Sequence, residues 1–252
     1  MSKIYDALKR AERERETARD RGREPGQTLE APTAPENGQN GHASQSGHGQ
    51  EEDDYRRLRA SLLFAPAYSD VRTIAITATR HGEGATRVAV GLARALASEG
   101  DTRVLLVEGN LRTPSFAQRL PIGKGPGLAE FLAGDASPAS IIGPLTGSPL
   151  SVISAGFRPA VIDCEAIAGA IAQVMEQFDY VIIDLPPVNR YSDASILAPK
   201  VDGVILVVEA DRTPVVDAES AKKSLDRVGA RIFGVVLNRR RSYVPATLQA
   251  LL

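Results

Sequence analysis

The stretch TIAITATRHGEGATRVAVGLARALA, residues 73–97, sets the architecture of this 252-residue chain. Its first five residues, 73–77, are mostly apolar or β-branched and predict a short buried strand. A turn with two glycines, Gly82 and Gly84, follows, and apolar residues then recur at helical spacing over about 84–99. A strand, a glycine-bearing turn and a helix in this order are the context in which backbone N–H groups cradle the phosphates of a nucleotide.

The rest of the chain repeats the alternation of short apolar runs with amphipathic stretches. Further strands are predicted at 104–107, 180–183, 204–208 and 232–237, and helices at 163–177, 192–198 and 214–228. Strands that are apolar on both faces and alternate with helices indicate an α/β fold, a mostly parallel sheet with helices on both faces. Ligands of such folds bind at the carboxyl ends of the strands, so we look there for the chemistry.

Composition divides the chain into four segments. Residues 1–20 carry apolar side chains at helical spacing and predict an amphipathic helix, either a docking helix for a partner or membrane surface, or a solvated helix. Residues 21–50 hold six glycines and three prolines and predict a flexible, disordered linker. Residues 51–245 form the α/β domain, and 246–252 are a C-terminal tail.

Global composition excludes several classes of protein. The 30 Lys and Arg nearly balance the 31 Asp and Glu, which argues against a nucleic acid partner. A single cysteine, Cys164, excludes an internal disulfide framework, and the carboxylates beside it in sequence favour a structural thiol. Without a secretory signal or an apolar run long enough to span a bilayer, we expect a cytoplasmic protein.

The glycine-bearing turn departs from the phosphate-loop pattern G-x-x-x-x-G-K-[ST]. Gly84 and Thr86 fit the last glycine and the Mg²⁺-binding hydroxyl, whereas Thr79 replaces the first glycine and Ala85 the lysine. Losing a charged hydrogen bond to phosphate costs about 1.5–3 kcal/mol of affinity. The predicted nucleotide-binding residues are Gly82, Glu83, Gly84, Ala85, Thr86 and Arg87.

Two further motifs follow predicted strands: VLLVEGNLRTPS at 104–115 and YVIIDLPPV at 180–188. Together with the turn at 79–86 they resemble the bacterial tyrosine autokinases of capsule and exopolysaccharide synthesis, the BY-kinases. The stretches GLAEFLAG, SDASILAPKVDGVILVV and GVVLNR add to the likeness, as does the opening MSKIYDALKRAE. The resemblance covers residues 1–20 and about 51–245.

The resemblance implies a phosphate-loop fold of the MinD/ParA type that binds ATP or ADP with Mg²⁺, the metal being held by Thr86 and Asp184. It implies a cytoplasmic domain, peripheral to the inner membrane through a membrane-embedded polysaccharide co-polymerase and the export machinery. Asp53, Arg56 and Arg59 resemble a motif that packs family members into a homo-oligomeric ring. Their spacing of three is equally typical of an ion-pair stripe along one helix.

The sequence departs from the family pattern at the positions to which the resemblance assigns catalytic roles. Beyond Ala85, the two aspartates to which the resemblance assigns metal and base roles are replaced by Glu108 and Asn110. The tyrosine-rich C-terminal tail is absent, because Tyr243 is the only tyrosine after Asn238. We therefore predict weak or absent nucleotide binding and no tyrosine kinase activity.

Three functions compete on this sequence. The leading hypothesis is a non-enzymatic regulatory or assembly subunit of an exopolysaccharide or capsule synthesis and export system. The alternative is an active autokinase in which Arg80 or Arg87 replaces the lysine, Glu108 and Asp184 serve catalysis and Tyr243 accepts phosphate. A MinD/ParA-like positioning ATPase is the third. The plain interpretation of Arg80 and Arg87 is two exposed charges.

Overall fold

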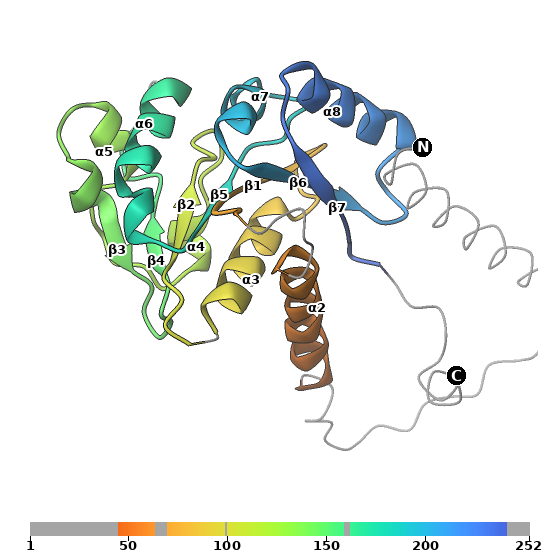
Figure 1. The fold of residues 1–252 in the computed structure, drawn as a ribbon, viewed down its shortest axis with the longest axis horizontal. Coiled ribbons are helices and arrows are strands. Elements are labelled where there is room, and N and C mark those ends of the chain that lie inside the picture. Colours follow the sequence, from red (N-terminus) through yellow and green to blue (C-terminus); the bar gives the residue numbers. More distant parts are fainter. Residues whose placement is uncertain (1–44, 64–69, 99, 159–161, 241–252) are drawn as a thin grey trace, which may run out of the picture.

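The computed structural model describes residues 45–63, 70–98, 100–158 and 162–240, which form one seven-stranded sheet with helices on both faces (Figure 1). The strand order is β3-β4-β2-β5-β1-β6-β7, and every neighbouring pair is parallel except β3 and β4. The strands are β1 (Thr73–Ala78), β2 (Val104–Glu108), β3 (Ile142–Pro144), β4 (Ser151–Ile153), β5 (Tyr180–Asp184), β6 (Gly203–Glu209) and β7 (Ile232–Asn238). β1 and β2 are buried along their whole length, as strands covered on both faces should be.

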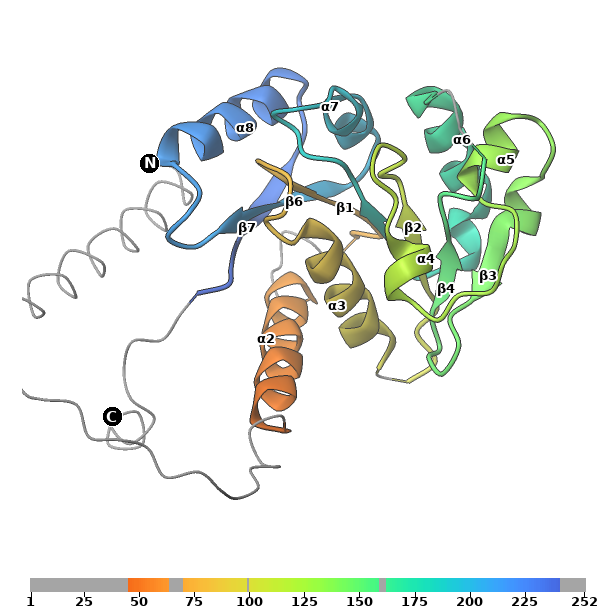
Figure 2. The same cartoon turned by 180° about the vertical axis from the view of Figure 1, so that it is seen from behind.

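Two groups of helices cover the sheet (Figures 1 and 2). One core layer contains side chains of α2 (Gln45–Leu63), α3 (Ala85–Ala97) and α4 (Phe116–Arg119). The opposite layer contains side chains of α5 (Leu128–Leu132), α6 (Cys164–Val174), α7 (Asp193–Leu197) and α8 (Val215–Arg227). Short 3₁₀ turns complete the fold: η2 (Pro138–Ile141), η3 (Met175–Gln177) and η4 (Ala198–Lys200).

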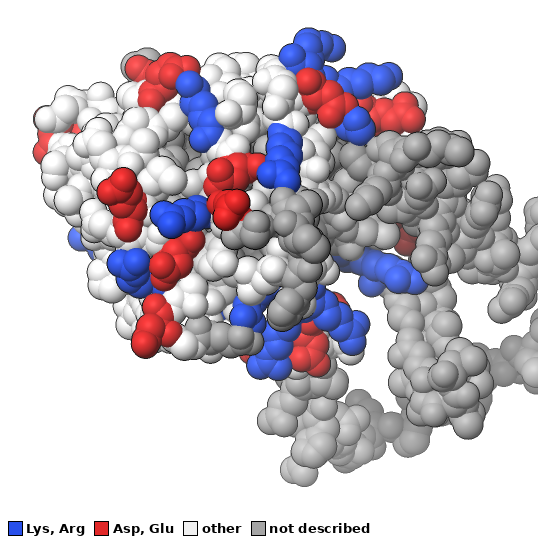
Figure 3. All heavy atoms as spheres, in the orientation of Figure 1, with Lys and Arg blue, Asp and Glu red and all other residues white. Residues whose placement is uncertain are grey.

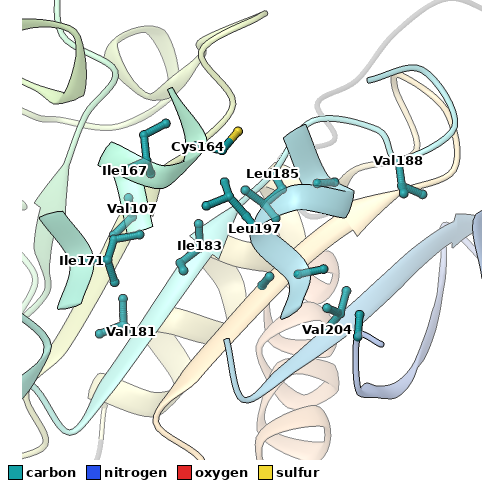
Figure 4. Packing of buried hydrophobic residues seen from close by; sticks show 14 of the residues in the cluster. Val107, Cys164, Ile167, Ile171, Val181, Ile183, Leu185, Val188, Leu197 and Val204 are labelled. Atoms are coloured by element: carbon teal, nitrogen blue, oxygen red, sulfur yellow. The ribbon is translucent and has the colours of Figure 1, made fainter. Parts of the chain in front are cut away.

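Figure 4 shows the second layer, where α6 and α7 pack on β2 and β5. Cys164 opens α6 and points into this cluster, and its thiol is buried. Burial raises the pKa of the Cys164 thiol, and the charges of Asp193 and Asp163 raise it further. A protonated, buried thiol is a packing group, as the flanking carboxylates predicted.

The α/β prediction and the five predicted strands are confirmed, each within two residues of its predicted ends. The sequence analysis missed β3 and β4, because three-residue strands are too short to show a period. α2 begins at Gln45, inside the segment predicted to be linker. Once the packed part of a helix has formed, each added residue costs little to order, so the helix extends into polar sequence.

Several predictions fall outside the described residues: the docking helix at 1–20, the linker as far as residue 44, the acceptor Tyr243 and the tail at 246–252. Among the helices that the structure describes, none has the length and apolar character to cross a bilayer. Basic and acidic side chains are interspersed over the face in Figure 3.

Candidate nucleotide-binding site

The loop between β1 and α3 has the shape of a phosphate cradle. Gly82 and Gly84 adopt φ of 89° and 97°, a left-handed conformation that glycine tolerates best. A Cβ on Gly84 would also lie 2.1 Å from the Nδ2 of Asn238 at the end of β7. Gly84 offers no side-chain cap to α3, so the first N–H groups of the helix are available to an anion.

The buried Glu83 carboxylate holds this loop in place. It accepts hydrogen bonds from the backbone N–H groups of Thr79 (2.8 Å) and Arg80 (2.9 Å). The hydroxyls of Thr79 (2.7 Å) and Thr213 (2.6 Å) also donate to it. Asn238 donates to the Glu83 carbonyl at 2.7 Å, which ties the loop to β7. The only acid of the loop therefore faces inward and shapes the cradle.

Thr86 and Asp184 meet at the carboxyl ends of the central strands. The Thr86 hydroxyl donates to Oδ2 of Asp184 at 2.7 Å, while Oδ1 is buried and has no hydrogen-bond partner among the residues that the structure describes. Burial raises the pKa of Asp184 to about 7, the negative charge of Glu108 adds to the rise, and the Thr86 hydrogen bond and the Arg119 charge oppose it. A hydroxyl beside a carboxylate with one unsatisfied oxygen fits Mg²⁺, which prefers oxygen ligands.

Glu108, in the second acidic motif, binds backbone N–H groups, unlike Asp184. Glu108 lies beside Asp184 in the register of β2 and β5. Its Oε1 accepts from the N–H groups of Ser115 (2.5 Å) and Phe116 (2.7 Å), and Oε2 from that of Ala155 (2.9 Å). Glu108 is thus committed to backbone groups, which leaves it poorly placed to act as a base.

Asn110, the second replaced aspartate, closes a turn. Its Oδ1 accepts from the Thr113 N–H at 3.2 Å, and its Nδ2 donates to the Thr113 hydroxyl at 3.1 Å. Asn110 also lines the cavity above the loop, whose volume is about 210 Å³. At this position a neutral amide replaces the charge that an aspartate would bring to a bound metal.

Four arginines line this cavity: Arg80, Arg87, Arg119 and Arg239. Three of them form ion pairs: Arg80 with Asp217 of α8, Arg87 with Glu51 of α2, and Arg239 with Glu209 at 3.1 Å. Both arginines named as substitutes for the lysine therefore face the cavity but are engaged with carboxylates. Arg119 alone of the four has no carboxylate partner within the part of the chain that the structure describes.

The residues assigned to an oligomer interface lie on α2. Arg56 pairs with Asp53 at 3.2 Å within the helix, both side chains being exposed, and Arg59 is half-buried one turn further on. The predicted ion-pair stripe is thus present in part, and the ring interface stays a prediction. A groove of about 660 Å³ is lined by residues of α2 and α3, Thr86 among them.

Comparison with known proteins agrees with this geometry. The model of the ParA family, described as "NUBPL iron-transfer P-loop NTPase", matches residues 71–250. The tyrosine-protein kinase CpsD of Streptococcus agalactiae is 30% identical over 193 residues, which are 75% of this chain and 83% of CpsD. The chain belongs to the BY-kinase branch of the ParA-type P-loop NTPases.

Two further similar proteins extend the comparison. The kinase domain of Escherichia coli tyrosine kinase ETK superposes with a TM-score of 0.68 at 25% identity, covering 77% of this chain and 79% of that domain. The succinoglycan biosynthesis transport protein ExoP of Rhizobium meliloti is 31% identical over 194 residues, 74% of this chain but only 25% of ExoP. The P-loop NTPase fold implies nucleotide binding, typically with Mg²⁺.

The structure brings together the loop, Thr86 and Asp184, which the sequence pattern had singled out, and adds three contributors that the pattern did not indicate. Asn238 was quoted only as part of a motif, and nothing in the local sequence linked Thr213 or Arg119 to the loop. Arg119 lies four residues beyond the end of VLLVEGNLRTPS, so the signal available was a basic residue in the turn of helix after that motif.

Proposed function

We propose that this protein is a nucleotide-binding regulatory subunit of an exopolysaccharide or capsule synthesis and export system, and that it does not phosphorylate tyrosine. The supporting observation is a division within one site. The glycine turn and the Thr86–Asp184 pair that would bind a nucleotide with Mg²⁺ are present although the loop lysine is missing, whereas the groups that would drive phosphoryl transfer are absent or engaged elsewhere.

The binding parts are the glycine cradle and the pair formed by Thr86 and Asp184, 2.7 Å apart. A bound Mg²⁺ would neutralise negative charge on the phosphates. Thr86 and Asp184 would hold it, and the N–H groups at the start of α3 would bind phosphate.

The transfer parts are reduced. Ala85 cannot place a cation on the phosphates, and removing one such transition-state donor costs about 10²–10³ in rate. The Glu108 carboxylate accepts three backbone N–H groups, and Asn110 carries no charge. Activating a tyrosine hydroxyl requires a base within reach of its proton, and both residues at these positions lack that capacity.

The proposed partner is inferred from the names of similar proteins. ExoP is named a succinoglycan biosynthesis transport protein, and this chain matches a quarter of it. We infer that the present protein acts beside a separate polysaccharide co-polymerase at the inner membrane, and that nucleotide occupancy reports to that partner.

The test is an assay for phosphotyrosine and for ADP after the purified full chain is incubated with Mg·ATP. We expect no phosphotyrosine, and ADP release no faster than from Asp184→Ala, while ATP binds to the wild-type chain. A phosphotyrosine signal that disappears in Asp184→Ala would contradict the proposal and establish the autokinase alternative.

A further inference from the structure

The P-loop cavity contains one cation whose role the known features leave unexplained. Arg80, Arg87 and Arg239 each pair with a carboxylate. Arg119 lines the same cavity and is exposed. In the described part of the chain no acidic side chain forms an ion pair with it. An unpaired guanidinium beside a phosphate cradle without its lysine is the observation to explain.

The backbone that carries Arg119 is firmly held. Arg119 ends α4, and the residues at either end of this turn of helix, Phe116 and Leu120, are 0% and 8% exposed. Glu108 binds the N–H groups of Ser115 and Phe116 at the start of the same helix. The replaced acidic residue of the second motif therefore anchors the helix that presents Arg119.

The positive charge of Arg119 is complementary to the negative charge of a bound phosphate. Ala85 and Thr86 line the cavity together with Arg119. A planar guanidinium matches phosphate geometry and can bind two oxygens at once.

We propose that Arg119 contacts the phosphates of the bound nucleotide and replaces the missing P-loop lysine from α4. This inference rests on the proposed function, since it requires that nucleotide binds. In this arrangement the positive charge comes from α4 and not from the P-loop. Ala85 and Glu108 are then linked, because Ala85 leaves the P-loop without its cation and Glu108 fixes the helix that supplies Arg119 in its place.

The experiment is calorimetric titration of Mg·ADP and Mg·ATP into the full chain, with Arg119→Ala and Arg94→Ala compared. Arg94 is a matched control, since it is also an exposed arginine and lines the neighbouring groove but not the P-loop cavity. We expect Arg119→Ala to weaken both nucleotides about 10–100-fold, the range for a lost charged hydrogen bond. Arg94→Ala should stay within about twofold, as for surface sites without such contacts.

A rescue variant makes the test specific to the missing lysine. Ala85→Lys should restore most of the affinity lost in Arg119→Ala, and should gain less in the wild-type background, because the two cations would serve the same phosphates. Thermal unfolding of Arg119→Ala without nucleotide should match the wild-type chain, since the side chain is exposed.

The possible failures are distinguishable. Wild-type binding with an unchanged affinity in Arg119→Ala overturns this inference alone, and so does a loss that Ala85→Lys fails to rescue. No binding of either nucleotide by the wild-type chain overturns both this inference and the proposed function.

Discussion

Glu83 illustrates how one buried carboxylate can determine the form of a binding loop. It accepts from the backbone N–H groups of Thr79 and Arg80 and from the hydroxyls of Thr79 and Thr213, and the two Thr79 donors are buried away from water. A buried donor without a partner costs about 1–3 kcal/mol.

We expect Glu83→Ala to lower the free energy of unfolding by at least about 2 kcal/mol, because the buried N–H and hydroxyl of Thr79 lose their acceptor together. Urea denaturation measures it. Glu219→Ala, at an exposed position on α8, is the control and should change stability by no more than about 0.5 kcal/mol. Equal effects of the two substitutions would show that Glu83 does not organise the loop.

Asp184 makes stability depend on pH. Its pKa of about 7 lies above the value near 3.9 of an unfolded chain, so the folded protein binds this proton more tightly. The contribution of Asp184 is therefore most favourable at low pH and is lost as the pH rises through about 7.

Asp184→Asn imitates the protonated form. It should stabilise the nucleotide-free protein by up to about 4 kcal/mol at pH 8, at ~1.4 kcal/mol per pKa unit, and by only about 1.5 kcal/mol at pH 5, which lies about one unit above the pKa of an unfolded aspartate. Denaturation curves at the two pH values measure the difference, and Glu219→Ala is again the control. If Asp184→Asn stabilised the protein equally at pH 5 and pH 8, the raised pKa could not belong to Asp184.

At the scale of elements, α2 is attached to the first turn of α3. Glu51 forms an ion pair with Arg87, and the Tyr55 hydroxyl donates to the Arg87 carbonyl at 3.2 Å. The Tyr55 ring lies against Gly91, where a Cβ would come within 2.3 Å of ring carbons. The residue after Thr86, the predicted metal ligand, is thus joined to the helix that carries Asp53, Arg56 and Arg59.

Gly91→Ala should push the Tyr55 ring off α3 and cost about 1–3 kcal/mol of stability, the usual cost of overpacking. Gly169→Ala is the matched control, because Gly169 is also inside a helix but has open space around it. That change should stabilise the protein by about 0.5–1 kcal/mol. Thermal unfolding compares them, and a stabilising Gly91→Ala would mean that α2 does not pack on α3 as described.

Elements that depend on local sequence could be predicted, whereas contacts between distant segments could not. β1, β2, β5, β6 and β7 were predictable because a strand buried on both faces must be apolar along its length. The loop and Asp184 were predictable because both follow such strands. Arg119 and the Glu51–Arg87 pair were not, because they depend on contacts between segments distant in sequence.

At the scale of the whole molecule, three strand ends converge on one cavity. β1 leads to the cradle, β5 ends at Asp184 and β2 ends at Glu108. Through Glu108 and α4, the nucleotide site is joined to one flank of the sheet, and through Arg87 to α2.

We expect the P-loop cavity to bind ATP without hydrolysing it. The most direct test is to incubate the full chain with Mg·ATP, isolate the protein, and identify the nucleotide that remains bound. We expect ATP, recovered intact and in an amount approaching one per chain. Recovery of ADP that forms only when Asp184 is present would contradict the central claim, because it would show that the site turns its nucleotide over.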